Sequence, residues 1–293
     1  MISRILLIML LAVSTQAKVN IVASLTDLAD IARQVGGKHV SVVSIARGSQ
    51  DPHYVEVLPS SMMKVKRADM YLMVGMELDQ WAEQIIDGSR NRQLRIVDCS
   101  SDIERVNVPT RKVDASMGDI HPNGNPHYWL DPENGKVIAR TIASNLKVVD
   151  PRHTEEYDNN LKVFIDSIDE LEAHWAMTYS SLNGKSVIYY HDTWPYFNRY
   201  FGLTATAFIE PKPGIMPTPT HLDHLIHIIN DQHIKVIAME PYFSQQAPAF
   251  LSGKTGATIV HMAQSVGAEE NTETYQKMLT YNLEVLMKAL NSQ

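Results

Sequence analysis

The stretch "DPRHTEEYDNNLKVFIDSIDELEAHWAMTYSSL" (residues 150–182) lies midway along the chain and carries one long apolar repeat. Its apolar residues recur at steps of three and four, which is typical of one face of an α-helix, and neither Gly nor Pro follows Pro151. Asp150 can cap this helix, and Pro151 suits the first helical position. Such a helix would be about 45–50 Å long at 1.5 Å per residue. It predicts a stiff connector between two halves of the chain, although an ordinary core helix has the same pattern.

Short apolar runs rich in Val and Ile lie on both sides of this stretch, four in each half. They are residues 19–25, 39–46, 68–75 and 95–100, then 186–191, 203–209, 235–240 and 257–262. Near-continuous apolar runs are typical of parallel strands covered on both faces, and helical spacing such as Leu28, Ile31 and Val35 separates them. We therefore predict an α/β fold of two lobes, each a parallel sheet of about four strands flanked by helices, joined by one long rigid helix. The predicted domains are an N-terminal lobe (18–149), the connecting helix (150–182) and a C-terminal lobe (183–293).

Residues 1–17 have the layout of a secretory signal peptide, with Arg4, an apolar run and a small residue, Ala17. The mature chain is expected to be periplasmic, and without a lipid anchor because no cysteine lies near the predicted cleavage point. The one cysteine, Cys99, excludes an internal disulfide. A formal net charge of −7 argues against a nucleic-acid partner. The composition stands out in its 12 histidines.

Four potential metal ligands fall where parallel strands end. His53 and His127 lie in loops of the first half, while His191 and Glu240 directly end strands of the second half. Ligands of open parallel sheets bind at the carboxyl ends of the strands. Three imidazoles and one carboxylate suit Zn²⁺. The sequence therefore predicts a zinc site at His53, His127, His191 and Glu240, in a cleft between the lobes.

The other histidines are given different roles. His224 and His227 lie opposite the apolar stripe of a predicted helix, so we expect them to face solvent. Asp119 and His121 lie in a polar loop that is either unstructured or a weak auxiliary metal site, and His261 ends the last predicted strand as a possible alternative ligand. Three further histidines have no apparent constellation and are interpreted as structural or surface residues: His39, His153 and His174.

The chain resembles the zinc- and manganese-binding solute-binding proteins of bacterial ABC importers (the cluster A-I family). The matching segments are "DPHYVEVLPSSMMKVKRADMYLMVGMELDQW", "NPHYWLDP", "YYHDTWPYFNRYFGL" and "AMEPYFS". The resemblance implies capture of a divalent transition metal outside the cytoplasm, delivery to a membrane permease, and metal ligands at His53, His127 and His191. We expect a monomer. Many members carry a fourth ligand, an aspartate, after the last strand, but this chain reads "IVHMAQSVGA" there, so Glu240, Asp51, a water or His261 remain alternatives.

Two other functions are compatible with parts of this pattern. Three histidines with an open position would also suit a zinc hydrolase, with Glu240 or Asp51 as general base, but the chain has no HExxH pair. A surface adhesin is compatible with an export signal and with nothing else in the sequence. We therefore predict a binding protein and no enzyme, with Zn²⁺ as the transported ligand and Mn²⁺ as the alternative.

Overall fold

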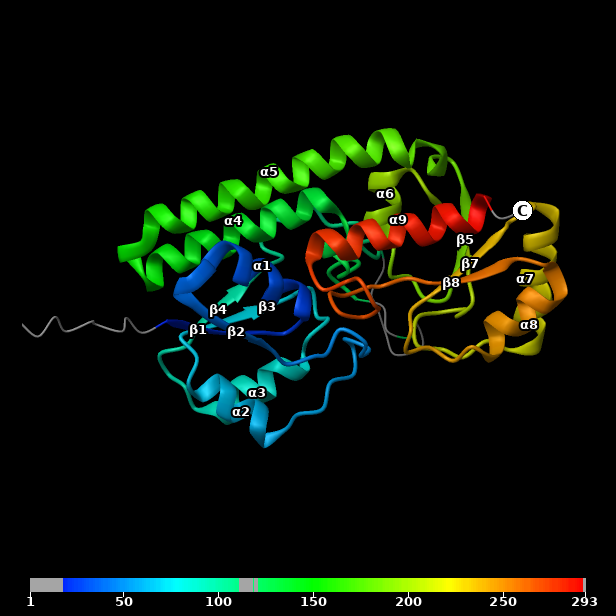
Figure 1. The fold of residues 1–293 in the computed structure, drawn as a ribbon. Helices are drawn as coiled ribbons and strands as arrows, with labels where there is room; N and C mark the ends of the chain where they lie inside the picture. The colour runs from blue at the N-terminus through cyan, green and yellow to red at the C-terminus, as the bar shows by residue number, and fades with distance from the viewer. Residues whose placement is uncertain (1–17, 111–117, 119–120, 292–293) are drawn as a thin grey trace, which may run out of the picture.

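Two parallel four-stranded sheets form the centres of two lobes (Figure 1). The computed structural model describes residues 18–110, 118 and 121–291, so the predicted signal peptide (1–17) lies outside the described residues. The strands are β1 (Val19–Ala23), β2 (Val40–Ser44), β3 (Met70–Met73), β4 (Arg95–Asp98), β5 (Ser186–Tyr189), β6 (Thr204–Phe208), β7 (Val236–Met239) and β8 (Thr258–His261). Their orders, β2-β1-β3-β4 and β6-β5-β7-β8, repeat one topology. The predicted α/β class with two parallel sheets is confirmed.

Helices cover both faces of each sheet (Figure 1). In the first half they are α1 (Thr26–Gly36), α2 (Pro59–Lys66), α3 (Trp81–Ser89) and α4 (Pro132–Val149), and in the second α6 (Pro195–Phe201), α7 (Pro219–Asp231), α8 (Gln246–Thr255) and α9 (Tyr275–Asn291). Leu28, Ile31 and Val35 are all buried, as the helical spacing of α1 predicts. Among the described residues, no helix combines the length and the apolar character that crossing a membrane requires.

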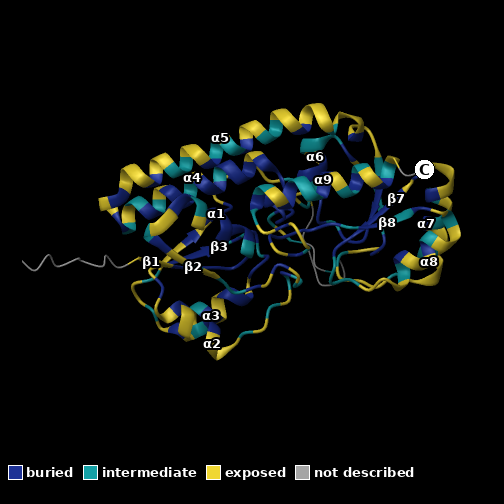
Figure 2. Cartoon of the chain, in the orientation of Figure 1, coloured by how far each residue is buried: buried dark blue, intermediate teal, exposed yellow. Residues whose placement is uncertain are grey.

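The predicted connector consists of α5 (Thr154–Thr178) between two 3₁₀ turns, Pro151–His153 (η4) and Ser180–Leu182 (η5). The α-helix is therefore shorter than expected, about 37 Å at 1.5 Å per residue. Asp150 makes no capping bond to the backbone of α5, because its carboxylate accepts hydrogen bonds from His153 and Tyr157 instead. The inner face of α5 is buried and its outer face is exposed (Figure 2).

A buried lysine fastens α5 to α4. The ammonium of Lys136 lies 2.8 Å from a carboxylate oxygen of Glu133, 2.5 Å from one of Asp169 and 2.8 Å from one of Glu172. A charge this deeply buried is tolerated only when it is paired. The two helices therefore behave as one rigid layer over the N-terminal sheet.

The two lobes share one hydrophobic core, which includes residues of α1, α4, α5, β5, β7 and α9. Tyr275, at the start of α9, donates its hydroxyl to the Trp129 carbonyl at 2.5 Å and its backbone N–H to Asp30 at 2.9 Å. Gly135 in α4 makes room for this tyrosine, because a Cβ there would lie 2.4 Å from the Tyr275 hydroxyl. Since α9 packs against α1 and α5, the division at residues 149 and 183 stays a prediction.

Candidate metal centre

Three loops at the carboxyl ends of the strands bring three histidines together. His53 follows β2, His127 precedes the 3₁₀ turn Tyr128–Leu130 (η3) that leads into α4, and His191 follows β5. One ligand nitrogen from each ring lies within 4.8 Å of the other two. The ring centroids lie 5.3–5.8 Å apart, and the ring planes are inclined by 55–76° to one another. The rings converge on one point between the lobes.

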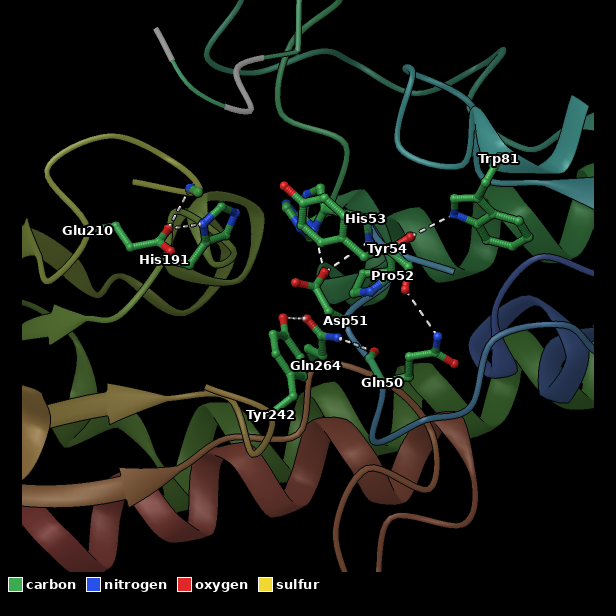
Figure 3. Close-up of polar contacts among 12 residues, drawn as sticks. Gln50, Asp51, Pro52, His53, Tyr54, Trp81, His191, Glu210, Tyr242 and Gln264 are labelled. Atoms are coloured by element: carbon green, nitrogen blue, oxygen red, sulfur yellow. Dashed lines mark hydrogen bonds and ion pairs between the residues drawn. The ribbon is translucent and has the colours of Figure 1, made fainter. Parts of the chain in front are cut away.

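An oxygen acceptor orients each ring through its Nδ1 atom. Nδ1 lies 2.8 Å from Asp51 in His53, 3.0 Å from Asn125 in His127 and 2.7 Å from Glu210 in His191 (Figure 3, which draws the first and third). Among the described residues, the Nε2 atoms of His53 and His127 are buried without a hydrogen-bond partner. A ring that donates its Nδ1–H to an oxygen offers its Nε2 lone pair to a metal. The imidazole rings are therefore already oriented to bind a metal ion through Nε2.

The sequence "Asx-Pro-His" produces the first two of these orientations. In residues 51–53 and 125–127 the Asx side chain accepts from the backbone N–H of the histidine two residues later, at 2.9 Å and 3.0 Å, and from its ring. Asx side chains make such local bonds readily, and the intervening proline restricts the backbone. The repeated tripeptide was a readable signal that our sequence analysis missed.

Glu210 is the third orienting residue, and we missed it as well. It follows β6 at the same sheet edge as His191, but it was not among the predicted site residues. Its Oε2 also accepts the backbone N–H of Gly214 at 3.0 Å, which fixes the carboxylate. The rule that selected His191 and Glu240, polar residues at strand ends, would have selected Glu210 too.

Burial and charge set the protonation of the centre in opposite ways. Burial lowers the pKa of His127 well below its ordinary value, and neighbouring histidines lower it further. Burial alone would also lower the pKa of His191, but its hydrogen bond to Glu210 and that carboxylate's charge raise it. Burial would raise the pKa of Asp51, but the hydrogen bond from His53 lowers it. Anionic carboxylates therefore surround imidazoles, a field that favours a cation.

Contacts from both lobes hold the His53 loop in place (Figure 3). The Trp81 indole, in α3, donates to the Pro52 carbonyl at 2.9 Å. From the other lobe, the Gln264 amide donates to the Gln50 carbonyl at 3.3 Å and accepts from the Tyr242 hydroxyl at 2.7 Å. Gln264 lies after β8 in the segment "IVHMAQSVGA", and both ends of its side-chain amide are engaged in this bridge.

The candidates for the fourth ligand lie in different surroundings. Glu240, after β7, is fully buried, and its Oε1 accepts from the Trp194 indole at 2.9 Å. Burial raises the pKa of the Glu240 carboxyl to about 7, although the charge of His191 acts to lower it. Among the described residues its carboxylate lies outside the three-histidine group. His261 lies outside it too, 3.6 Å from Glu269, and Asp51 is engaged with His53.

The other polar residues considered as metal ligands lie in different parts of the molecule. His121 stacks obliquely on His53, with centroids 5.4 Å apart, and lines a cavity of about 400 Å³ together with Glu77 and Trp81. Asp119 lies outside the described residues. His224 and His227 of α7 are exposed, as expected. Helix α7 is capped by Thr218, whose hydroxyl accepts the His221 N–H at 3.3 Å.

Comparisons with known proteins agree with this geometry. Residues 21–289 match the profile of the family described as "ZnuA: Zinc-uptake complex component A periplasmic". The metal ABC transporter substrate-binding lipoprotein ScbA of Streptococcus cristatus is 24% identical over 284 residues, covering 94% of this chain and 90% of its own. The manganese ABC transporter substrate-binding lipoprotein PsaA of Streptococcus pneumoniae is 23% identical over 287 residues, covering 95% and 91%.

The fold has close counterparts among solved structures. The crystal structure of ZnuA superposes with a TM-score of 0.81 at 22% identity, covering 93% of this chain and 99% of that one. Both curated relatives named above are called lipoproteins, which is contrary to our expectation of no lipid anchor. Family membership also answers the hydrolase alternative, because these are substrate-binding proteins for metal transport and not enzymes. The chain belongs to the extracytoplasmic metal-binding solute-binding proteins that serve the membrane permeases of ABC importers.

Proposed function

We propose that the chain captures one Zn²⁺ ion between its lobes, through His53, His127 and His191, and delivers it to a permease. The observation that carries this proposal is the set of three imidazoles whose Nδ1 atoms are all held by oxygen acceptors. This leaves three Nε2 donors converging on one point. Histidine-rich tetrahedral sets suit Zn²⁺, whereas carboxylate-rich sets suit Mn²⁺.

Manganese is the second candidate cargo, and the name of a relative favours it. PsaA of Streptococcus pneumoniae is named a manganese ABC transporter substrate-binding lipoprotein, and it matches nearly the whole chain. Against manganese stands the donor set of this chain, which has three imidazoles and, among the described residues, no carboxylate within the group. The choice of metal is therefore proposed on donor chemistry rather than on relatedness.

For the fourth position we keep Glu240 as the proposed ligand. It is a fully buried carboxylate at a strand end of the C-terminal lobe, and the charge of His191 acts on it. An anionic ligand would offset one unit of the charge of the ion. Because its oxygens lie outside the three-histidine group, coordination requires the side chain or the rings to shift.

Elemental mass spectrometry of the purified native chain, followed by competition between Zn²⁺ and Mn²⁺, tests the metal. We expect one zinc per chain and displacement of manganese by zinc. Tight manganese with weak zinc would overturn the zinc assignment and leave the family function intact. Two equally tight ions per chain would overturn the single cargo site.

We also propose that the mature chain acts as a periplasmic monomer. Its three cargo histidines all come from one chain, so ligation needs no second copy. Sedimentation of the chain purified from its native cells tests this statement. A larger assembly would overturn it.

A further inference from the structure

A second imidazole cluster lies at the opposite, amino-terminal edge of the first sheet. His39 ends the 3₁₀ turn Gly37–His39 (η1) directly before β2, and His153 ends the turn before α5. Glu156 lies in the first turn of α5, three residues beyond His153 and on the same face. The expectation that His39 and His153 have no constellation was wrong, because the fold joins segments that are far apart in sequence.

The donor atoms of this cluster are close together. One ligand atom each of His39, His153 and Glu156 lies within 4.8 Å of the others. Nε2 of His39 lies 3.9 Å from Oε1 of Glu156 and, among the described residues, is buried without a hydrogen-bond partner. A buried imidazole nitrogen without a hydrogen bond needs an explanation.

A carboxylate orients one of the two rings. Oδ2 of Asp150 lies 2.5 Å from Nδ1 of His153 and accepts the Tyr157 hydroxyl at 3.0 Å. Tyr157 is fully buried, so its hydroxyl holds the Asp150 carboxylate in place from the protein interior. With Nδ1 engaged, Nε2 of His153 is the atom left for a metal, the relationship seen at Asp51 and His53.

The turn that carries His39 is fixed against α5 as well. The side-chain amide of Asn160 donates to the Val35 carbonyl at 3.0 Å. Gly37 has φ of +55°, and a Cβ at this position would lie 2.8 Å from the Asn160 amide. Both halves of the cluster are thus positioned by α5 before any ligand arrives.

We propose that His39, His153 and Glu156 form a second, weaker site for a divalent transition metal of the Zn²⁺ class. Two imidazoles and one carboxylate are a known donor set for zinc. An ion bound there would clamp the start of β2 to the start of α5, and so stabilise the connector without taking part in cargo transfer.

Three features make this site weaker than the cargo site. The rings are stacked, with centroids 3.7 Å apart and planes 23° apart, and must tilt to share an ion, because a metal lies in the plane of each imidazole that binds it. The Glu156 side chain is 48% exposed, so water competes for its place. Lys38 and Arg152 flank the two histidines in sequence, and their charges oppose a cation.

Calorimetric titration of the full mature chain with Zn²⁺ alone tests the proposal. We expect one tight step and one weaker step. His39→Ala should abolish the weaker step, and Glu156→Gln, at a half-exposed position, should weaken it by at least about tenfold while leaving the tight step unchanged. His127→Ala should do the reverse, which separates failure of this site from failure of the cargo site.

The exposed pair on α7 provides the matched control. His224→Ala with His227→Ala removes two surface imidazoles without touching either cluster, so both steps should remain. A single step in the wild-type chain up to millimolar zinc overturns the proposal. So does a weaker step that survives His39→Ala and Glu156→Gln, or that disappears in the α7 double variant.

Discussion

The two imidazole clusters lie at opposite edges of the N-terminal sheet and differ in how their rings are arranged. At the carboxyl edge, the planes of His53, His127 and His191 are inclined by 55–76°, and each Nδ1 is bonded to an oxygen. At the amino edge, His39 and His153 stack at 23°. The number of nearby histidines is therefore a poor guide to a metal site, and the direction of their lone pairs is a better one.

The clusters also differ in what they join. The carboxyl-edge histidines come from both lobes, so an ion there is enclosed from two sides. The amino-edge donors come from the N-terminal lobe and from the start of the connector, next to solvent, with Glu156 half exposed. Enclosure excludes water and strengthens electrostatic attraction, which predicts a tight cargo site and a weak structural one.

The largest effect should come from removing a cargo ligand. His53→Ala, His127→Ala or His191→Ala should each weaken zinc binding by more than about 100-fold, since loss of an orienting partner alone costs 10–100-fold. Competition with a chromogenic chelator measures this. If His53→Ala kept the tight site while the His224/His227 double variant lost it, the tight site would lie on α7 and not at the carboxyl-edge cluster.

Replacing Glu240 by Ala should cost less than replacing a histidine if water or Asp51 takes its place. The same chelator competition measures the difference. A loss as large as that of His127→Ala would show that Glu240 is a full ligand and that the rings and the carboxylate move together on binding.

Removal of an orienting residue should have an intermediate effect. Glu210→Ala deletes the acceptor of the His191 Nδ1–H, which lies 2.7 Å away, and should weaken zinc binding about 10–100-fold. Glu210→Gln keeps an acceptor oxygen and should cost less, as the neutral Asn125 suffices for His127. Equal losses in both variants would mean that the negative charge of Glu210 matters more for zinc binding than the orientation of the His191 ring.

Acid should weaken cargo binding by up to about tenfold per pH unit for each histidine that titrates. A proton and the metal compete for the same nitrogen. Since Glu210 raises the pKa of His191, this ring protonates before His127 as the pH falls, because the pKa of His127 is lowered. Zinc affinity measured across pH 5–7.5, around the ordinary histidine pKa of about 6.5, should decline in acid. A flat profile would exclude histidine-dominated binding.

The smallest expected effect concerns the shape of the molecule. The uninterrupted α5, its bond to α4 through Lys136 and the shared core oppose large lobe rotation. Small-angle scattering of metal-free and zinc-loaded protein should therefore give nearly superimposable profiles. Compaction on loading would show that the cargo site, unlike the amino-edge cluster, is assembled by domain closure.

Much of the fold was readable from the chain alone. All eight strands fall within the predicted runs, and the connector was found, because burial on both faces and helical spacing are local patterns. The three histidines of the proposed cargo site were predicted from their place at strand ends, a rule of parallel sheets, and the structure brings them together. Helix ends were less accurate, since Asp150 bonds His153 and Tyr157 rather than capping α5.

What only the tertiary structure decided is which side chains meet. Glu210 reaches His191, and Gln264 bridges Tyr242 and Gln50, through contacts between separate loops. His39 meets His153 because α5 packs against α1, which leads into the turn that carries His39. Amino-acid periodicity reports the face on which a residue lies, because that depends on neighbours three or four positions away. The partner of a side chain depends instead on other segments, which in these examples lie 19 to 214 residues away, and packing brings those segments together.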